Sequence, residues 1–221
     1  EGAFENPGLF TPDKQYYHDM IKKTRAAGGL IVIDEVQSGL CRQGENVWSY
    51  QNSGLVPDII TMGKPLGCGH PLAATIVKRS VIEEFGKITD YFNTFGGNPV
   101  STAAGRAVLQ YIHKENILQD VHDTGVYFRA GIAKLQEKHN VIGDVRGKGM
   151  FIGIDLVKDR STKEHAPAEA ARLIELLREE GMLLSTVGVE ENVLKVRPPL
   201  IFNKQHADIA LDMMANAFKA L

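Results

Sequence analysis

The stretch LIVIDEVQSGL, residues 30–40, runs four apolar residues into Asp34 and Glu35 and then into a polar turn with a glycine. An apolar run of this kind is typical of a strand that is buried on both faces of a parallel sheet. In open α/β sheets, ligands bind beyond the carboxyl ends of the strands. The stretch therefore predicts a buried parallel strand that delivers a charged group to a site at its end.

Helical and strand patterns alternate through the first half of the chain. A helix is expected from Thr11 and Pro12, as cap and first-turn residues, to the glycines at 28–29. The further expected elements are strands at 30–33, 58–62 and 72–77, a short helix near residue 48, a helix around 81–85, and a long helix that opens at Asn98 or Ser101. This order predicts a mostly parallel, layered α/β sheet through about residue 115.

The second half of the chain follows a different pattern. RGKGMFIGIDLVKD, residues 146–159, is expected to turn and then form a strand with two unlike faces. Helices at 126–135 and 167–180, a strand at 192–200 and a last helix from Asn203 complete the pattern. We therefore predict two domains, a large α/β domain at 1–115 and a small α+β domain at 116–221, with the long helix as the hinge.

Composition limits the classes of function. The 221 residues are 43% apolar and 24% charged, with a formal net charge of −2, so nucleic acid is not an expected partner. No apolar stretch approaches the roughly 20 residues of a membrane-spanning helix. The two cysteines and seven scattered histidines lack the spacing of a metal site, so no metal is expected, and a reducing cytoplasm is the expected location.

Lys64 and Asp34 each follow a predicted strand, and the ends of neighbouring parallel strands share one edge of a sheet. A lysine in a partly desolvated pocket becomes a nucleophile for an aldehyde. A pyridine ring that serves as an electron sink needs an anion at its nitrogen. One lysine and one aspartate meet both requirements. The alternative from spacing alone is a surface lysine in a glycine loop and a carboxylate that caps a helix.

Three motifs in register make the pattern more specific: VIDEVQSGLCRQG at 32–44, PDIITMGKPLGCGHPLAA at 57–74 and YFNTFGGNPVSTAAG at 91–105. Together they resemble the class III aminotransferases, pyridoxal-phosphate enzymes of fold type I, and the resemblance extends over essentially the whole chain. It implies pyridoxal 5'-phosphate as cofactor and transfer of an amino group from an amine or amino acid to an oxo acid. It also implies a homodimer with the active site at the subunit interface.

The resemblance also implies roles for single residues. Lys64 matches the lysine that forms a Schiff base with the cofactor and later shuttles the α-proton. Asp34 matches the aspartate that faces the pyridinium nitrogen. Val36 matches the residue packed on one face of the ring, and Gln37 the residue near its phenolic oxygen. Thr94 matches a threonine that reaches the cofactor phosphate of the neighbouring subunit.

Two further residues are implied as substrate contacts. Arg197, in VRPPL, matches an arginine that pairs with a substrate carboxylate in many relatives, and a guanidinium suits this role. Its alternative is a surface arginine beside a proline turn. Glu1 falls where relatives have an active-site glutamate, but Gly2 follows it where many relatives have proline.

Two other functions stay open. The motifs also resemble the branch that contains ethanolamine-phosphate phospho-lyase, in which the same carbanion expels a phosphate from a phosphorylated amine. A non-catalytic dimerisation or regulatory module is the third hypothesis, because the chain matches only the second half of the family's usual length. The family's glycine/serine phosphate loop precedes the matching part of the chain, so this sequence is either a fragment of a longer enzyme or only part of that enzyme's sequence, and the residues alone leave both open.

Overall fold

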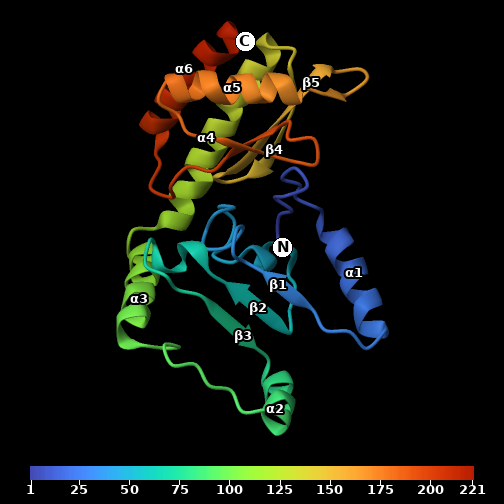
Figure 1. Cartoon of the computed structure of the whole chain (residues 1–221), viewed down its shortest axis with the longest axis vertical. Coiled ribbons are helices and arrows are strands. Elements are labelled where there is room, and N and C mark those ends of the chain that lie inside the picture. Colours follow the sequence, from blue (N-terminus) through green and yellow to red (C-terminus); the bar gives the residue numbers. More distant parts are fainter. The chain divides into compact units, whose positions relative to one another are not determined.

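The computed structural model describes all 221 residues, and their packing divides the chain into two units (Figure 1). Unit 1 comprises Glu1–Gly2, Pro12–Leu40 and Asn46–Ile117. Unit 2 comprises Ala3–Thr11, Cys41–Glu45 and Leu118–Leu221. The predicted domain boundary after residue 115 placed the short segments Ala3–Thr11 and Cys41–Glu45 in the first domain. That division into domains stays a prediction. No helix in either unit combines the length and the apolar character needed to cross a bilayer.

Unit 1 contains a three-stranded sheet in the order β1-β2-β3. The strands are β1 (Val32–Asp34), β2 (Ile59–Met62) and β3 (Ala74–Val77). β1 pairs in parallel with β2, with Asp34 opposite Thr61, whereas β3 runs antiparallel to β2. The expected parallel pairing of the two apolar strands is therefore present, next to one antiparallel pair.

The helices of unit 1 are α1 (Lys14–Ala26), α2 (Arg79–Ile88) and α3 (Pro99–Lys114), with short 3-10 helices η1 (Ser49–Ser53) and η2 (Lys64–Gly67). The expected cap of the first helix was wrong. Asp13 caps α1, because its Oδ1 accepts the backbone N–H of Tyr16 at 2.8 Å. Asn98 caps α3 as expected, and its side chain accepts the N–H of Ser101.

One face of the first strand is open. Ile31 and Ile33 are buried, whereas the side chains of Leu30 and Val32, which alternate with them, are each 54% exposed. Successive side chains of a strand point to opposite faces of the sheet. The expectation of burial on both faces is therefore wrong for these residues, because the elements of unit 1 cover only one face of β1.

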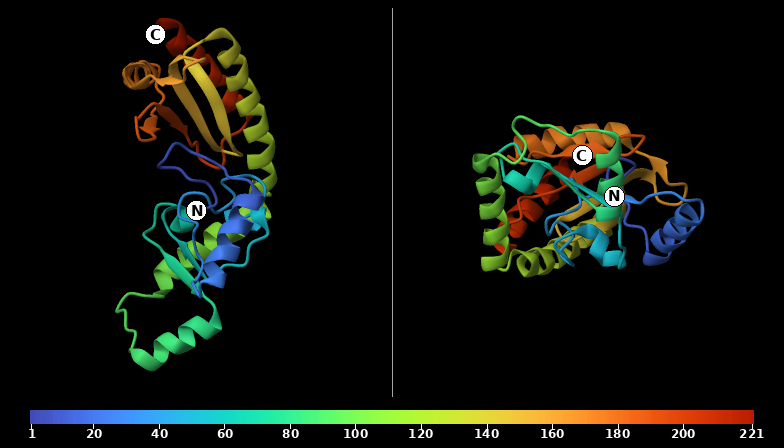
Figure 2. Two further views of the ribbon diagram at one scale, coloured as in Figure 1. Left: turned by 90° about the vertical axis from the view of Figure 1, so that its right-hand side faces the viewer. Right: turned by 90° about the horizontal axis from the view of Figure 1, so that it is seen from below.

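Unit 2 contains an antiparallel sheet in the order β4-β5-β8-β7, and β6 pairs with the end of β5. The strands are β4 (Ile142–Lys148), β5 (Phe151–Asp159), β6 (Glu164–His165), β7 (Ser185–Val187) and β8 (Val193–Val196). The helices are α4 (Ile117–Lys138), α5 (Pro167–Glu179) and α6 (Lys204–Ala220) (Figure 2). The stretch 146–159 forms the end of β4, a turn and β5. Its pattern predicted a turn and one strand, so β5 is as expected, whereas β4 was not predicted.

The largest apolar core lies between the helices of unit 2 and one face of β5. Ile152, Ile154 and Leu156 point into it and are fully buried. α4 and α6 pack closely, because a Cβ added to Gly131 would lie 2.3 Å from the Leu211 side chain. On the other face of β5, Phe151 packs against Ala3 and Leu9. The two faces of β5 are thus unlike, as expected, but both are covered.

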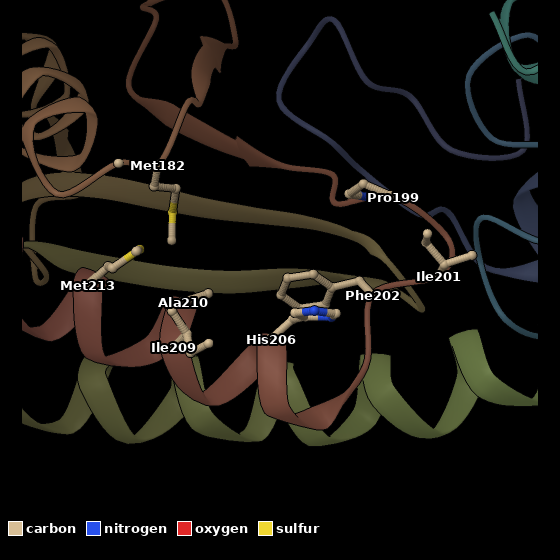
Figure 3. A pocket seen from close by; sticks show the side chains of 9 residues that line it. Met182, Pro199, Ile201, Phe202, His206, Ile209, Ala210 and Met213 are labelled. Atoms are coloured by element: carbon tan, nitrogen blue, oxygen red, sulfur yellow. The ribbon is translucent and has the colours of Figure 1, made fainter.

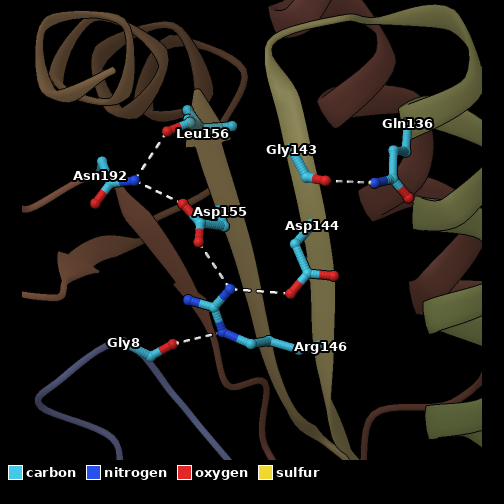
Figure 4. A network of polar contacts seen from close by, with 8 residues as sticks. All are labelled: Gly8, Gln136, Gly143, Asp144, Arg146, Asp155, Leu156 and Asn192. Atoms are coloured by element: carbon cyan, nitrogen blue, oxygen red, sulfur yellow. Dashed lines mark hydrogen bonds and ion pairs between the residues drawn. The ribbon is translucent and has the colours of Figure 1, made fainter. Parts of the chain in front are cut away.

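Arg146 fastens the segment 3–11 to this sheet (Figure 4). Its Nε donates to the carbonyl of Gly8 at 2.8 Å, and its Nη1 lies 2.8 Å from Asp155 Oδ2. Its guanidinium carbon stands 4.4 Å from the centre of the Phe10 ring. The side chain of Asn192 donates to Asp155 Oδ1 at 2.6 Å. One partly buried network therefore joins β4, β5 and the N-terminal segment.

Asp58 holds the amino end of the sheet in unit 1. Its Oδ2 accepts the backbone N–H of Ile31 at 2.8 Å, and its Oδ1 lies 2.7 Å from Lys78 Nζ. The side chain is only 8% exposed. The hydrogen bond from Lys78, followed by that from Ile31, lowers the pKa of Asp58 from its ordinary value of 3.8.

We expect Asp58→Asn to lower the free energy of unfolding by roughly 2 kcal/mol at neutral pH, since it removes a charge-assisted hydrogen bond. A lowered folded-state pKa gives stability that is present above the unfolded pKa and lost as pH falls through the folded pKa. Asp58→Asn should therefore lose less stability than wild type when urea unfolding is repeated below the ordinary pKa of 3.8. The exposed Asp19→Asn is the matched control, and equal effects of both variants would contradict the role of Asp58.

Candidate active site

Asp34 and Lys64 come from neighbouring strand ends. Asp34 is the last residue of β1, and Lys64 follows the last residue of β2 by two positions. Since β1 and β2 are parallel neighbours, both residues start from the same edge of the sheet. A Cβ added to Gly63 would lie 3.7 Å from Val36 Cγ2, so Val36 lies beside the step from β2 to Lys64.

The groups at this edge differ in how they are held. Asp34 Oδ1 accepts the backbone N–H of Val36 at 2.8 Å, which orients the carboxylate, and Oδ2 makes no hydrogen bond within the chain. Lys64 Nζ makes no hydrogen bond or ion pair. The backbone of Lys64 has φ +42°, in the left-handed region that residues other than glycine seldom adopt. Such strain is concentrated at functional sites.

The desolvated pocket expected around Lys64 is not formed by these residues. Lys64 is exposed, and Asp34, Val36 and Gln37 are half-buried. Burial of the amine is what would make it a nucleophile. Any desolvation of Lys64 must therefore come from groups that bind over the open edge.

Glu35, the second acid of the opening stretch, has a structural role. Its carboxylate accepts the N–H of Ser49 at 2.8 Å, the hydroxyl of Ser49 at 2.7 Å and the N–H of Tyr50 at 2.8 Å. Burial raises the pKa of Glu35, and the three hydrogen bonds oppose the shift without cancelling it. Glu35 therefore anchors the start of η1 to the end of β1, a role that its sequence position left undecided.

Two glycines make room for this anchor. A Cβ at Gly39 would lie 2.7 Å from the Glu35 carboxylate, and a Cβ at Gly2 would lie 2.1 Å from Ser49 Oγ. The departure from proline at position 2 thus has a steric reason in this chain. Glu1 itself is half-buried, and its carbonyl accepts a hydrogen bond from the Tyr17 hydroxyl at 3.0 Å. Its role as a substrate contact stays a prediction.

Arg197 lies in unit 2, directly after β8, beside a buried carboxylate. Its Nη1 stands 3.9 Å from Glu5 Oε2, and Lys195 Nζ lies 2.7 Å from Glu5 Oε1. The side chain of Glu5 is only 2% exposed. No sequence signal pointed to Glu5, because its two partners lie near the other end of the chain.

Arg42 adds a third cation to this cluster. Its guanidinium donates to the carbonyl of Pro198, the residue after Arg197, and also to that of Met150. Burial, and then the charge of Arg197, lowers the pKa of Arg42 to about 10. Lys195 and Arg197 thus pair with one buried carboxylate, and Arg42 lies close enough to Arg197 for their charges to interact. Cations outnumber the anion in this cluster, an arrangement that attracts a further anion.

Thr94 lies apart from the strand ends, on the exposed loop before α3. Large apolar side chains of the same region are exposed as well: Ile88, Tyr91, Phe92 and Phe95 are 84%, 75%, 85% and 79% exposed. The structure therefore brings Asp34, Val36 and Lys64 to one edge, with Gln37 next along the chain, and leaves Thr94 on an exposed loop with apolar neighbours.

A pocket of about 370 Å³ in unit 2 contains none of the candidate residues (Figure 3). It is lined by Gly181, Met182, Pro199, Ile201, Phe202, His206, Ile209, Ala210 and Met213. The one titratable side chain, His206, already accepts the N–H of Asn203 at its Nδ1, where it completes the cap of α6. This pocket therefore offers mainly apolar surface, with His206 as its one titratable group.

A profile of the family described as aminotransferase class-III matches residues 3–218. Among curated proteins, the chain is 42% identical to ethanolamine-phosphate phospho-lyase homolog 1 of Caenorhabditis elegans, over 90% of this chain and 43% of that protein. It is 43% identical to the mitochondrial alanine–glyoxylate aminotransferase 2 homolog 2 of Arabidopsis thaliana, over 89% of this chain and 40% of that protein. The chain thus spans less than half the length of these relatives.

Two solved structures confirm the expected fold class. A phospholyase from Arthrobacter in complex with phosphoethanolamine is 43% identical and superposes with a TM-score of 0.92, over 96% of this chain and half of that chain. An aminotransferase from Bacillus anthracis is 30% identical, with a TM-score of 0.90, over 97% of this chain and half of that chain.

Glu35→Gln should lower the free energy of unfolding by roughly 2 kcal/mol at neutral pH, because an amide cannot accept all three hydrogen bonds. Because burial raises the folded pKa above the ordinary 4.5, the stability contributed by Glu35 falls as pH rises from 4.5 towards the folded value. Glu35→Gln should remove this part of the pH dependence, which urea unfolding at several pH values measures.

The control for this variant is Glu84→Gln. Glu84 is two-thirds exposed and paired with Lys87 on the surface of α2. Glu84→Gln should therefore lower the free energy of unfolding by no more than about 1 kcal/mol. A Glu35→Gln protein with wild-type stability and an unchanged pH profile would refute the anchoring role.

Proposed function

Because the chain belongs to the class-III aminotransferase family, we propose that it contributes to an enzyme that uses pyridoxal 5'-phosphate and transfers an amino group from an amine or amino acid to an oxo acid. The observation that supports this proposal is the placement of Asp34 and Lys64 at neighbouring carboxyl ends of parallel strands. The family resemblance alone would not distinguish a catalytic chain from one that keeps only the fold.

The donor set at this edge fits the cofactor. It consists of one amine and one carboxylate, without the cluster of ligands that a metal would need. When bound, pyridoxal 5'-phosphate supplies an aldehyde for amines and a ring that draws electrons from the substrate's α-carbon. Lys64 Nζ would hold the aldehyde, and the carboxylate of Asp34 would keep the ring nitrogen protonated. Val36 would pack on the ring face and Gln37 would face the phenolic oxygen.

Lys64 would have a second task after the substrate amine displaces it. Its free Nζ would take the proton from the substrate's α-carbon and return it to the exocyclic carbon, as a general base and then a general acid. The strained backbone at Lys64 fixes where this side chain starts. Arg197 would bind the anionic group of the substrate. Glu1 would be a second substrate contact.

We also propose a homodimer with the active site at the subunit interface. The support is the exposed apolar surface of Ile88, Tyr91, Phe92 and Phe95, which flanks Thr94. Exposed apolar patches of this kind mark protein interfaces. A second copy that covers them would bring Thr94 to the phosphate of the neighbouring cofactor.

A phospho-lyase that acts on ethanolamine phosphate or a similar phosphorylated amine is the second candidate. Relatives more than 40% identical carry this name or bind phosphoethanolamine. Arg42, Lys195 and Arg197 together exceed the charge of Glu5, and this surplus suits a phosphate dianion better than a single carboxylate.

A non-catalytic dimerisation or regulatory module is the third candidate. A module of this kind needs the fold and the apolar surface around Thr94 but has no use for a strained lysine with a free amine. We therefore place it behind the two enzymatic readings.

We propose the cytoplasm as the location. Cys41 and Cys68 are both free thiols, as expected in a reducing compartment. The mitochondrial relatives make the mitochondrial matrix, which is also reducing, the alternative.

The assignment of Lys64 can be tested by labelling. Purified protein is incubated with pyridoxal 5'-phosphate and reduced with borohydride, and the modified lysine is mapped by mass spectrometry. We expect one main adduct, on Lys64, and its loss in Lys64→Ala. Lys87→Ala, which removes an exposed surface lysine, should leave the adduct in place. Labelling spread over surface lysines without Lys64 would favour the non-catalytic module.

Product analysis separates the two enzymatic candidates. The protein is supplied with pyridoxal 5'-phosphate and phosphoethanolamine without any oxo acid, and inorganic phosphate is measured. The aminotransferase hypothesis expects no sustained release, because the amino group needs an acceptor, whereas alanine with glyoxylate should give pyruvate. Sustained phosphate release that is lost in Lys64→Ala would favour the phospho-lyase instead.

A further inference from the structure

Two loops of unit 1 carry residues assigned to the cofactor, and a side-chain hydrogen bond joins one of them to the helix that follows the other. One loop begins at Lys64 and runs through η2 to residue 72, and the other, at 91–98, carries Thr94. His70 Nε2, in the first loop, lies 2.8 Å from Ser101 Oγ, in the first turn of α3. β3 and α2 separate the two loops in sequence, so this contact is not a local consequence of chain connectivity.

The Thr94 loop is shaped by two asparagines. Asn93 Oδ1 accepts the N–H groups of Phe95 and Gly96 at 3.1 and 2.9 Å. Asn98 caps α3 through its Oδ1, which accepts the N–H of Ser101 at 2.9 Å. The amide nitrogen of Asn98 donates to the carbonyl of Phe95 at 2.9 Å and to Ser101 Oγ at 3.0 Å. Ser101 Oγ therefore contacts both Asn98, the cap residue of α3 at the end of the Thr94 loop, and His70.

Backbone hydrogen bonds close two successive turns in the loop that begins at Lys64. The N–H of Leu66 donates to the carbonyl of Gly63 at 3.1 Å, and the N–H of His70 donates to that of Gly67 at 3.0 Å. α3 approaches this loop closely, since a Cβ on Gly105 would lie 2.5 Å from Leu72 Cδ2. Apolar packing thus holds α3 against the loop that begins at Lys64. The His70–Ser101 hydrogen bond adds a polar contact with a defined geometry between the loop and the first turn of α3.

We propose that His70 is a positioning residue that holds the Thr94 loop in a fixed relation to the Lys64 loop, through Ser101 and Asn98. The hydrogen-bond relay stands on its own geometry, and only its meaning for cofactor binding rests on the proposed function. If Thr94 serves the phosphate site of a second copy, His70 couples the lysine of one subunit to the phosphate site of its neighbour.

The test is amide hydrogen exchange of the full chain without cofactor. His70→Ala should speed exchange of the Ser101 amide and of the amides at 95–96 by about fivefold, the effect of one lost hydrogen bond. His70→Gln should restore rates to within about twofold of wild type, because its amide can offer a donor or an acceptor at the position of Nε2. His113 is an exposed histidine in α3, the helix that contains Ser101. His113→Ala is the matched control and should leave the exchange rates unchanged.

Ser101→Ala should speed exchange of the 95–96 amides at least as much as His70→Ala does, because it removes the contacts of Ser101 Oγ with both His70 and Asn98. The double variant should be no worse than Ser101→Ala alone, because the contact with His70 is then already lost. In holoprotein, affinity for pyridoxal 5'-phosphate should fall about fivefold in His70→Ala and recover in His70→Gln.

Unchanged exchange in His70→Ala would overturn the proposal. So would a rise spread evenly over unit 1, including α1, or a failure of His70→Gln to restore the rates. Absence of an adduct on Lys64 would count against the proposed function alone, since the exchange experiment contains no cofactor.

Discussion

The parallel pairing of β1 with β2 is the constraint on which the candidate site depends. Asp34 lies opposite Thr61, and the N–H of Glu35 extends the ladder by donating to the carbonyl of Thr61 at 2.8 Å. Neighbouring side chains of a strand point to opposite faces, so a shift of one residue would exchange Asp34 and Glu35. The Asp34 carboxylate would then turn towards η1 and that of Glu35 towards the open edge, so neither acid would keep its present hydrogen-bond partners.

Two buried carboxylates hold this register from opposite ends of the sheet, by different physical means. Asp58 is neutralised by the ammonium of Lys78, which lowers its pKa. Glu35 has three neutral donors from Ser49 and Tyr50 around it, and its burial raises its pKa. A cation at the site end would compete for Asp34, so neutral donors anchor Glu35 without disturbing the charge of its neighbour.

The sequence predicted features that local patterns encode. Strand ends at Asp34 and before Lys64, and helix starts at Asn98 (with Ser101 as the alternative) and Asn203, follow from apolar runs and polar residues at the start of helical patterns. Thr11 was the wrong cap because Asp13, two positions later, is a better acceptor for the first turn of α1.

Contacts between distant segments could not be predicted in the same way. Glu5 pairs with Lys195 across 190 positions and Arg146 binds Gly8 across 138, and no periodicity links such residues. The open face of β1 was also not predicted. An apolar residue such as Val32 indicates a buried position, but it does not indicate whether the residues that cover it belong to the same stretch of chain. The bond between His70 and Ser101 is of the same kind, since neither residue forms a local motif with the other.

The backbone at Lys64 says more about the site than the freedom of its side chain does. An exposed ammonium group is well hydrated, so the absence of a partner for Nζ costs the fold nothing and is common on protein surfaces. A left-handed backbone at a residue with a Cβ costs about 1–3 kcal/mol and persists only where the surroundings impose it. The surroundings here include the turn in which the N–H of Leu66 donates to the carbonyl of Gly63, and the packing of Leu72 against α3 at Gly105. The backbone strain at Lys64 thus costs stability, whereas the amine of its side chain stays free. A placed side chain with a free amine is what a covalent attachment site requires.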